Sequence, residues 1–281
     1  MIRNGRQLRG ARTGARIAVL TVLALVMIAP FLYLVSTSFK PNRFSFEWPP
    51  EFLPRPFTVD NYVQAWSAND FARYFLNSAL VATTATLATV LLSALAAYAF
   101  ARFRFPGRTL LFWTLMLGLM VPTVVILIPQ FILARGLGLT DSLSGLVFFY
   151  VGGGVAFTTF LLRGFFEQLP VELDESMRLD GAGTVRRFVA LYLPLSRPAL
   201  ATGAVFAFLA AWDEYPWALT TINDPDKQTL PLAIAQFQGQ HATSWGLVFA
   251  ASLIALIPVV TIYLVGQRHF VAGLTAGALK S

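Results

Sequence analysis

The stretch PVELDESMRLDGAGTVRRFVALYLPLSRP, residues 170–198, is a polar and charged island in an otherwise apolar chain. It predicts two short helices joined by a glycine turn. Pro170 suits a first helical turn, because its missing N–H would have no partner there. Acidic residues follow it, and negative charge is favoured at a helix N-terminus. The tetrapeptide Asp180-Gly181-Ala182-Gly183 then breaks the helix, with glycine available for a left-handed cap.

The second helix of the island is predicted to begin at Thr184, which can cap it, and to stop at Leu193-Pro194. One apolar face is predicted from residues three and four apart, namely Val185, Phe188, Val189 and Tyr192. A soluble helix-turn-helix for DNA would share this outline, but long apolar stretches flank the island on both sides. We therefore expect a unit displayed between membrane spans and shaped to fit a groove on another protein.

The composition predicts an all-α, polytopic membrane protein. Of the 281 residues 56% are hydrophobic and 12% are charged, and the mean hydropathy is +0.64; a soluble domain carries about 25% charged residues. A bilayer core is crossed by about 20 helical residues, and apolar runs of this length do not alternate as barrel strands do. Six predicted spans meet this requirement, at 17–36, 77–100, 109–133, 144–162, 199–220 and 244–266.

Basic residues predict the orientation. Fifteen of the 21 lysines and arginines fall in residues 1–16, 101–108, 163–198 and 267–281. The positive-inside rule then places both termini and the 163–198 loop in the cytoplasm. The predicted organisation is a cytoplasmic tail (1–16), a six-helix domain (17–266) and a second cytoplasmic tail (267–281). The net charge of +7 is therefore explained by the basic residues of the cytoplasmic segments and does not indicate nucleic-acid binding.

The N-terminus also resembles a secretory signal, with a basic start and then an apolar run. The apolar run is longer than a usual signal core, so we expect an uncleaved first span. The chain has no cysteine and only two histidines, His241 and His269, so we expect no metal site. No glycine precedes a lysine as in a nucleotide-binding Gly-Lys-Ser/Thr loop. If the protein is driven by ATP, another subunit binds the nucleotide.

The island closely resembles the EAA signature of permease subunits in binding-protein-dependent ABC importers. That signature runs Glu-Ala-Ala, three residues, Gly, nine residues, Ile-x-Leu-Pro. The resemblance departs from it at Ser176, Met177 and Leu191 and implies a surface that couples to an ATPase. The residues it assigns to coupling are Glu175, Ser176, Met177, Asp180, Gly181, Ala182, Gly183, Leu193 and Pro194.

Most of the chain from about residue 20 is similar to the second permease of maltose-type carbohydrate importers. The similarity is carried by Asn61-Tyr62, Asn77-Ser78, Ala97-Tyr98-Ala99, Arg104-Phe105-Pro106-Gly107, Val121-Pro122, Trp212-Asp213-Glu214-Tyr215 and the tail 267–280. That family usually has Trp-Asn-Glu, so Asp213 is a departure. The resemblance implies the type I importer permease fold in a bacterial inner membrane. It also implies a second permease, two ATPase subunits that bind ATP and Mg, an external solute-binding protein and a di- or oligosaccharide.

Several residues at membrane depth are candidates for the substrate pathway. Asp213 and Glu214 are predicted in the outer third of the fifth span, where carboxylates are costly and usually functional. Trp212 and Tyr215 beside them could stack on a sugar or anchor the interface, and Glu214 could instead pair with a neighbouring span. Pro122 and Pro129 are predicted to kink the third span. The kink could line the transport pathway or serve only the packing of the helices.

We therefore expect a permease subunit without an active site of its own and with no cofactor in this chain. Amino-sugar or glycerol-phosphate cargo remains open within the same importer class. A secondary transporter often shows inverted repeats, which the sequence does not, and a membrane enzyme would need a catalytic constellation that the two histidines do not supply.

Overall fold

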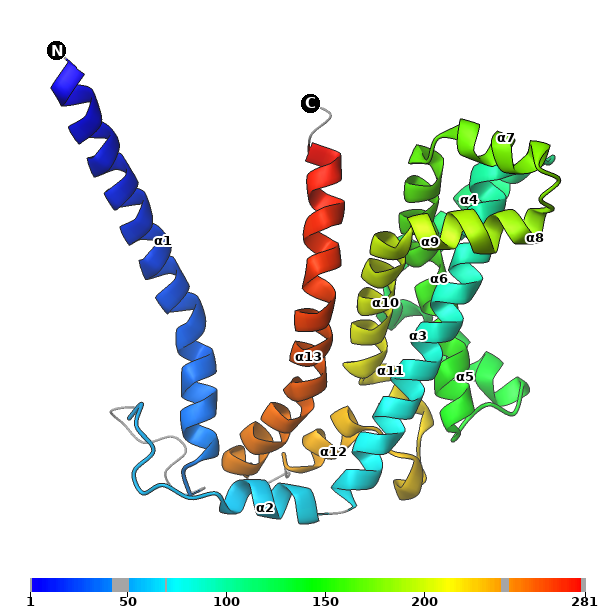
Figure 1. Ribbon diagram of the computed structural model, residues 1–281. Coiled ribbons are helices and arrows are strands. Elements are labelled where there is room, and N and C mark those ends of the chain that lie inside the picture. The colour runs from blue at the N-terminus through cyan, green and yellow to red at the C-terminus, as the bar shows by residue number, and fades with distance from the viewer. Residues whose placement is uncertain (1, 42–50, 69, 239–242, 279–281) are drawn as a thin grey trace. The chain divides into compact units, whose positions relative to one another are not determined.

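The computed structural model describes residues 2–41, 51–68, 70–238 and 243–278, and no strand is formed among them (Figure 1), which confirms the all-α class. The helices are α1 (Ile2–Ser38), α2 (Asp60–Ser67), α3 (Phe71–Arg102), α4 (Arg108–Leu117), η2 (Gly118–Met120), α5 (Thr123–Gly136), α6 (Leu143–Gln168), α7 (Val171–Leu179), α8 (Thr184–Arg187), η3 (Phe188–Tyr192), α9 (Leu193–Leu195), α10 (Arg197–Trp212), α11 (Pro216–Thr221), η4 (Pro225–Lys227), α12 (Leu230–Gln236) and α13 (Trp245–Ala278).

Membrane-spanning length occurs in four described helices, over Arg16–Ser38, Phe71–Arg102, Leu143–Gln168 and Trp245–Gln267. Two bent pairs bring the number to six if each pair is one span. The first, Arg108–Met120 with Thr123–Gly136, bends by 108°, and the second, Thr184–Leu195 with Arg197–Trp212, bends by 79°. The structure therefore has four helices of spanning length, and at most six spans, where the sequence predicts six.

The predicted third span is corrected by the first bend, and the predicted fifth span is corrected by the end of α10. The third is interrupted at Val121-Pro122, as the proline predicted, whereas Pro129 lies inside α5. The fifth was predicted over 199–220, but α10 ends at Trp212 and a separate short helix, α11, follows. Pro216 opens α11, because a residue without an N–H is tolerated in a first turn.

The chain divides into two compact units, residues 1–69 with 234–254, and residues 70–233 with 255–281. In the first unit the end of α1 is held by Asn61 of α2. The side-chain amide of Asn61 donates to the carbonyl oxygens of Ser38 and Lys40 at 2.8 and 2.7 Å. The Tyr62 hydroxyl lies 2.7 Å from that of Ser38. A Cβ on Gly246 would lie within 2.9 Å of the Asn61 side chain, so glycine permits the close approach of α13.

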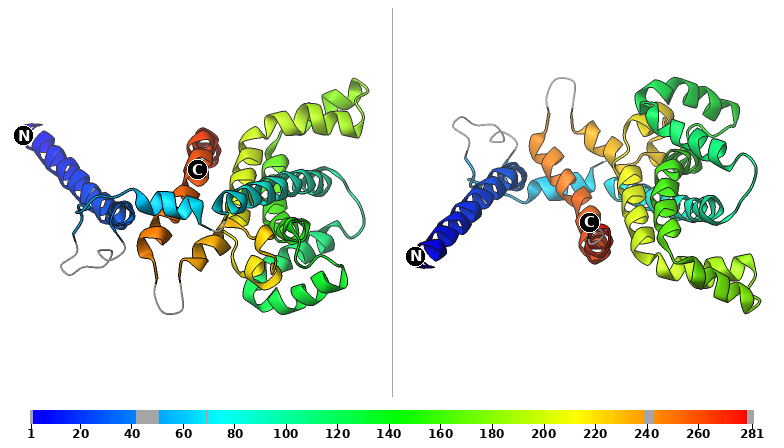
Figure 2. Two further views of the ribbon diagram at one scale, coloured as in Figure 1. Left: turned by 90° about the horizontal axis from the view of Figure 1, so that it is seen from below. Right: turned by 90° about the horizontal axis from the view of Figure 1, so that it is seen from above.

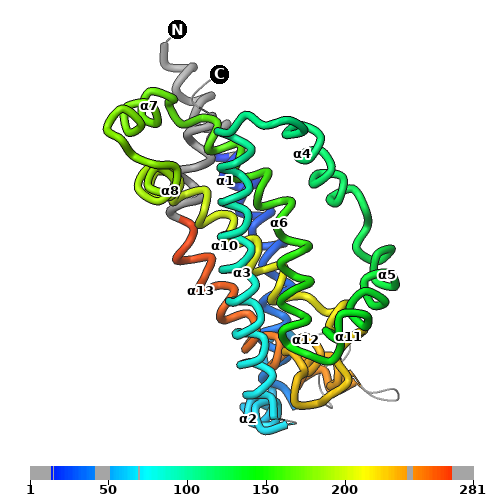
Figure 3. The backbone as a smooth tube through the Cα atoms, turned by 90° about the vertical axis from the view of Figure 1, so that its right-hand side faces the viewer, coloured from blue at the N-terminus to red at the C-terminus, as the bar shows by residue number. Residues whose placement is uncertain are grey.

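The second unit is built on α3, α6 and α10, which pack along one another (Figure 3). Small residues allow the close packing: a Cβ on Gly154 would lie 3.0 Å from Thr89, and one on Gly203 would lie 3.0 Å from Thr158. Helices α7 and α8 form a hairpin at one end of this core, and α11 lies at the other end. Both views in Figure 2 show the hairpin projecting beyond α3, α6 and α10.

Large apolar side chains remain exposed on several helices of the two units, as a lipid-facing surface requires. On α1 they include Val22, Val26 and Met27, and on α4 and α5 they include Leu110, Val124 and Ile128. A soluble protein exposes apolar side chains singly, whereas a run along whole helices indicates contact with lipid or with another protein.

Candidate functional site

The hairpin α7–α8 has the turn that the sequence predicts. Glu172 and Asp174 lie in the first turn of α7. At its end Gly181 adopts a positive φ of 78°, which glycine tolerates without a steric cost. The Gly181 N–H then donates to the Arg178 carbonyl at 3.0 Å, and the Ala182 N–H donates to that of Met177 at 2.9 Å. These two bonds close the helix and turn the chain back.

An ion pair that the sequence did not single out joins the two arms of the hairpin. A terminal nitrogen of Arg187 lies 2.6 Å from the Asp174 carboxylate, and the two side chains are only 14% and 16% exposed. Residues 13 apart on either side of a glycine turn can meet in a helical hairpin. Other oppositely charged residues on the two arms, such as Arg186 and Glu175, could form an ion pair in the same way. The structure selects this pair and thereby makes the hairpin one stiff unit.

Aromatic side chains anchor the base of the hairpin to the core. The ring of Tyr192 packs on Tyr98 and Phe166 with centroids 4.6 and 5.6 Å apart, and Phe188 packs on Tyr98 at 5.2 Å. Arg102, near the end of α3, donates to the carbonyl oxygens of Phe166 and Leu169 at 2.6 and 2.8 Å. These contacts hold the ends of α3, α6 and η3 together at the base of the hairpin.

The predicted apolar face of the second arm is wrong in half of its members. Phe188 and Tyr192 are buried, whereas Val185 and Val189 are 75% and 54% exposed. The π turn η3 takes more residues per turn than an α-helix, so Phe188 and Tyr192, four residues apart, point in nearly the same direction, toward the core, and Val185 and Val189 lie to one side of them. Leu179, near the end of α7, is another exposed apolar side chain of the hairpin, with 89% of its surface exposed.

The ends of the second arm also differ from prediction. Gly183 occupies the N-cap position, and Thr184 is the first helical residue with no capping bond from its side chain. The helical conformation of the second arm does not end at Leu193-Pro194. A short helix, α9, begins at Leu193, so the missing N–H of Pro194 falls in a first turn and costs little.

The residues assigned to coupling by the resemblance lie together on the hairpin and its exit. Glu175, Ser176, Asp180, Gly181, Gly183 and Pro194 are exposed, Met177 and Leu193 are half-buried, and Ala182 is buried. Five of the six exposed members lie in α7 or in the turn after it, and Pro194 lies in α9.

A second feature is a cavity of about 1170 Å³ between α4–α5, α6 and α10. Its wall is largely apolar, with polar groups from Thr89, Gln130, Tyr150 and Glu214. Of the predicted pathway residues, Glu214 and Pro129 line it, and Pro122 does not although both of its neighbours do. The sequence did not single out Tyr150 and Gln130, because a lone tyrosine or glutamine in a predicted span does not indicate which other helix its side chain faces.

Glu214 lies in the break between α10 and α11, where it joins three elements. Its carboxylate accepts from the Tyr150 hydroxyl of α6 at 2.7 Å. It also accepts from the backbone N–H groups of Trp217 and Ala218 at 2.7 and 3.1 Å. Glu214 thus combines the two readings that the sequence left open, because it pairs with a neighbouring span and also lines the cavity.

The other three members of the motif are placed elsewhere. Trp212 is buried, stacks on Phe208 with centroids 5.4 Å apart, and donates from Nε1 to the Ala255 carbonyl at 3.2 Å. Asp213 is exposed and Tyr215 is half-buried. None of the three lines the cavity, so the structure does not present Trp212 or Tyr215 as a stacking face there.

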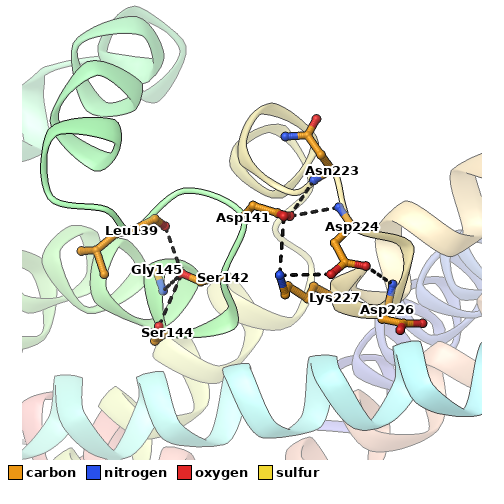
Figure 4. Close-up of polar contacts among 9 residues, drawn as sticks. All are labelled: Leu139, Asp141, Ser142, Ser144, Gly145, Asn223, Asp224, Asp226 and Lys227. Carbon is orange, nitrogen blue, oxygen red and sulfur yellow. Dashed lines mark hydrogen bonds and ion pairs between the residues drawn. The ribbon is translucent and has the colours of Figure 1, made fainter.

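A polar network joins two loops at the α11 end of the second unit (Figure 4). The Asp141 carboxylate accepts from the N–H groups of Asn223 and Asp224, both at 3.0 Å, and the Lys227 ammonium lies 3.1 Å from Asp224. The N–H groups of Asp224 and Asn223 hold the pKa of Asp141 below its ordinary value. The Asp224 carboxylate raises the pKa of Lys227. The network fixes the 222–229 loop to the start of α6.

Among the described residues, no group of three or more His, Cys, Asp or Glu side chains is arranged to hold a metal ion. The carboxylates of the α11 end bind N–H groups and an ammonium instead. We assign no cofactor role to them.

Comparison with known proteins identifies the family. Residues 64–275 match the family described as binding-protein-dependent transport system inner membrane component. The chain is 38% identical to the trehalose/maltose transport system permease protein MalG of Thermococcus litoralis, over 92% of this chain and 94% of that protein. It is 34% identical to the diacetylchitobiose uptake system permease protein NgcG of Streptomyces coelicolor, over 94% and 87%.

The fold is also shared with a solved structure of a bacterial ABC transporter involved in import of the acidic polysaccharide alginate. The TM-score is 0.79 at 23% identity, and the match covers 91% of this chain and 95% of that one. The all-α fold with its projecting hairpin is therefore the permease fold of an ABC importer. The chain belongs to the family of binding-protein-dependent transport system inner membrane components.

Proposed function

We propose that the chain pairs with a second permease to form the pathway for a di- or oligosaccharide. An external solute-binding protein delivers the sugar, and two ATPase subunits, which hold ATP and Mg, drive the cycle. The observation that carries the proposal is the exposed hairpin 171–195, which is joined stiffly to the helices that line the cavity. The names of the relatives from Thermococcus litoralis and Streptomyces coelicolor support a saccharide as cargo.

In this proposal the hairpin is the ATPase docking site. Leu179, Val185 and Val189 supply an apolar patch, and Glu175 and Asp180 supply charge at its edge. When the ATPases close, they displace the hairpin. The Asp174–Arg187 pair and the aromatic base carry that displacement to α3, α6 and α10, and the cavity changes the side to which it opens. A bistable pair of permeases needs such a rigid lever.

The cavity then forms one half of the sugar pathway, and the second permease supplies the facing wall. Glu214 and Gln130 offer hydrogen-bonding groups toward it, and sugar hydroxyls both donate and accept such bonds. Trp212, Asp213, Tyr215 and Pro122 would act on the pathway only by supporting Glu214 and the bend of the third span.

The orientation follows from the basic residues. The hairpin end is cytoplasmic, both termini are cytoplasmic, and the Asp141–Lys227 network is external. The tail 267–281 also belongs to the cytoplasmic side, and its side chains beyond Gln267 lie outside the described residues.

A second candidate cargo is an amino sugar. The relative from Streptomyces coelicolor carries diacetylchitobiose in its name, and its identity to this chain is nearly that of the trehalose/maltose relative. An acetamido group presents one N–H donor and one carbonyl acceptor, for which Glu214 and Gln130 offer matching partners.

The test is reconstitution of the importer in proteoliposomes with its ATPases and solute-binding protein. Glu175→Lys and Gly181→Asp are expected to release the ATPase or to separate ATP hydrolysis from uptake, while the chain still inserts. Asp60→Lys, the same kind of charge reversal on exposed α2, is the matched control and retains the ATPase. Normal sugar uptake and ATPase retention in both hairpin variants would refute the docking assignment. Ligand binding by the cognate solute-binding protein decides between a neutral saccharide and an amino sugar.

A further inference from the structure

A second cavity lies at the hairpin end of the helical core, apart from the proposed sugar cavity. It has a volume of about 780 Å³ and is a groove between the starts of α4 and α10 and the end of α6. Arg108 is the first residue of α4, Pro198 the second of α10, and Gln168 the last of α6. All three line the groove, so one end of it lies at the boundary where the membrane-spanning helices meet the cytoplasm in the proposed orientation.

This end of the groove is cationic. Arg108 and Phe112 lie four residues apart and so share one face of α4, and the Arg163 guanidinium lies over the Phe112 ring at 3.9 Å. A terminal nitrogen of Arg108 donates to the Phe103 carbonyl at 3.1 Å, and both arginines line this end of the groove. Glu167 accepts from Nε of Arg163 at 2.8 Å, but the terminal nitrogens of Arg163 bond to no residue that the structure describes. Arg108 and Arg163 carry two positive charges and Glu167 carries one negative charge, so this end of the groove has a net positive charge.

The remainder of the groove is apolar. Phe112, Trp113, Phe160 and Phe206 line it, and Trp113 is 62% exposed about one turn inside the cytoplasmic boundary. Tryptophan is enriched at this depth in membrane proteins. An amphiphile with an anionic head and a hydrocarbon tail matches both parts of the groove.

We propose that this groove is a binding site for an anionic phospholipid of the cytoplasmic leaflet. The phosphate lies between Arg108 and Arg163, and an acyl chain lies along Phe112 and Phe160. Basic pockets between spans on the cytoplasmic side bind anionic headgroups by this chemistry. A helix of a partner protein would have to bring an acidic side chain to this depth, whereas a phospholipid carries its phosphate at headgroup level. The leaflet rests on the proposed orientation; the binding chemistry does not.

The experiment uses the full chain and the assembled importer, purified in detergent and supplied with phosphatidylglycerol or phosphatidylcholine. Native mass spectrometry counts the lipids that remain bound. Arg108→Gln and Arg163→Gln are each expected to lower phosphatidylglycerol affinity about fivefold, because one basic side chain near a membrane surface contributes that much. Arg104→Gln, an exposed arginine of the same connection that does not line the groove, is the matched control and changes nothing.

A steric variant keeps the test independent of charge. A Cβ on Gly164 meets open space, and Gly164 lines the groove, so Gly164→Leu places an apolar side chain in the groove. It is expected to reduce bound phosphatidylglycerol as strongly as the loss of an arginine. Gly152→Leu, which also meets open space but lines the other cavity, is expected to retain the lipid.

Three results would overturn the proposal. They are equal retention of phosphatidylcholine, retention unchanged in the arginine and Gly164 variants, and loss of the lipid from the assembled importer while the free chain keeps it. The last result would assign the groove to the second permease. If the orientation alone is wrong, the lipid is retained, and a cysteine placed on the hairpin at Ser176 reacts with an impermeant maleimide from outside the cell, so the two failures are distinguishable.

Discussion

Glu214 shows what a single carboxylate does at the break of a membrane-spanning helix. It accepts two backbone N–H groups at the start of α11 and the Tyr150 hydroxyl of α6, while it lines the cavity. Its neighbour Asp213 is exposed and has no place in the cavity wall. The sequence indicated that a carboxylate here was functional, because of its cost at membrane depth, but the partner on α6 was not predictable. Tyr150 lies 64 residues away in a glycine-rich stretch.

We expect Glu214→Gln to impair transport at constant protein level. The amide has one acceptor oxygen in place of two, so one of the three hydrogen bonds to a charged group is lost, at a local cost of about 1.5–3 kcal/mol. Tyr150→Phe removes one bond and is expected to give a smaller defect, and the double variant little more than Glu214→Gln. Uptake per permease in proteoliposomes measures this. Asp213→Asn, the control, is expected to be mild; a stronger defect in Asp213→Asn than in Glu214→Gln would contradict this assignment.

Asp141 predicts a pH dependence at the loops of the α11 end. Its pKa is lowered by the N–H groups of Asp224 and Asn223 and by Lys227, so the bound carboxylate stabilises the folded state. That stabilisation is fully present above the ordinary aspartate pKa of 3.8 and is lost as the pH falls through the lowered folded-state pKa. The melting temperature should therefore fall steeply on acidification below about pH 4.

Asp141→Asn is expected to melt lower at neutral pH and to show a flatter dependence below pH 4. Differential scanning fluorimetry in detergent from neutral to acidic pH is the measurement. Asp60→Asn, which lies outside the network, serves as control and should follow the wild-type curve. Identical curves for wild type and Asp141→Asn would show that the network carries no measurable stability.

At the scale of elements, apolar run length predicted which helices exist, and local chemistry decided where they break. The four unbroken spans were recovered because long apolar runs admit only a helix in lipid. The end of α10 at Trp212 was missed because residues 213–220 remain mostly apolar, and the break is made by Glu214 and Pro216, whose effect depends on capping. The hairpin turn was predicted because Gly181 has a conformational requirement that the sequence states directly.

The hairpin is expected to depend on the ion pair between its arms. Asp174→Ala or Arg187→Ala leaves one mostly buried charge without its partner, which costs about 1–3 kcal/mol. The hairpin then loosens, and uptake per ATP hydrolysed should fall more than ATP hydrolysis itself. The exchanged pair, Asp174→Arg with Arg187→Asp, is expected to recover part of the coupling. Coupling that is unchanged in both single variants would remove the pair from the transmission path.

At the scale of the whole molecule, the exposed apolar surface is that of a membrane protein, and the charge asymmetry is the basis for the proposal that the hairpin is cytoplasmic. The exposed apolar side chains of α1, α4 and α5 need lipid or a second permease to cover them. The sequence predicted a polytopic membrane protein, but it did not indicate which helices surround the cavity. In the proposed importer this chain supplies only one wall of the sugar pathway, and the second permease supplies the other. Contacts such as Gly154 with Thr89 follow from three-dimensional packing that no local pattern encodes.

Orientation can be tested directly because the chain contains no cysteine. Ser67→Cys on α2 and Ser144→Cys at the start of α6 are exposed positions expected to react with an impermeant maleimide added to intact cells. Ser176→Cys on the hairpin is expected to react only after the membrane is opened. Labelling of Ser176→Cys from outside would reverse the proposed orientation.

The central claim is that the α7–α8 hairpin docks on the ATPase, and cross-linking tests it most directly. Ser176→Cys, in an otherwise cysteine-free chain, is placed in the assembled importer and treated with a short bifunctional maleimide, and Ser67→Cys is treated in the same way. We predict a covalent product between Ser176→Cys and the ATPase, whose yield changes when ATP is added, and no such product from Ser67→Cys. An active importer in which Ser176→Cys forms no ATPase product, or forms it no more than Ser67→Cys does, would contradict the claim.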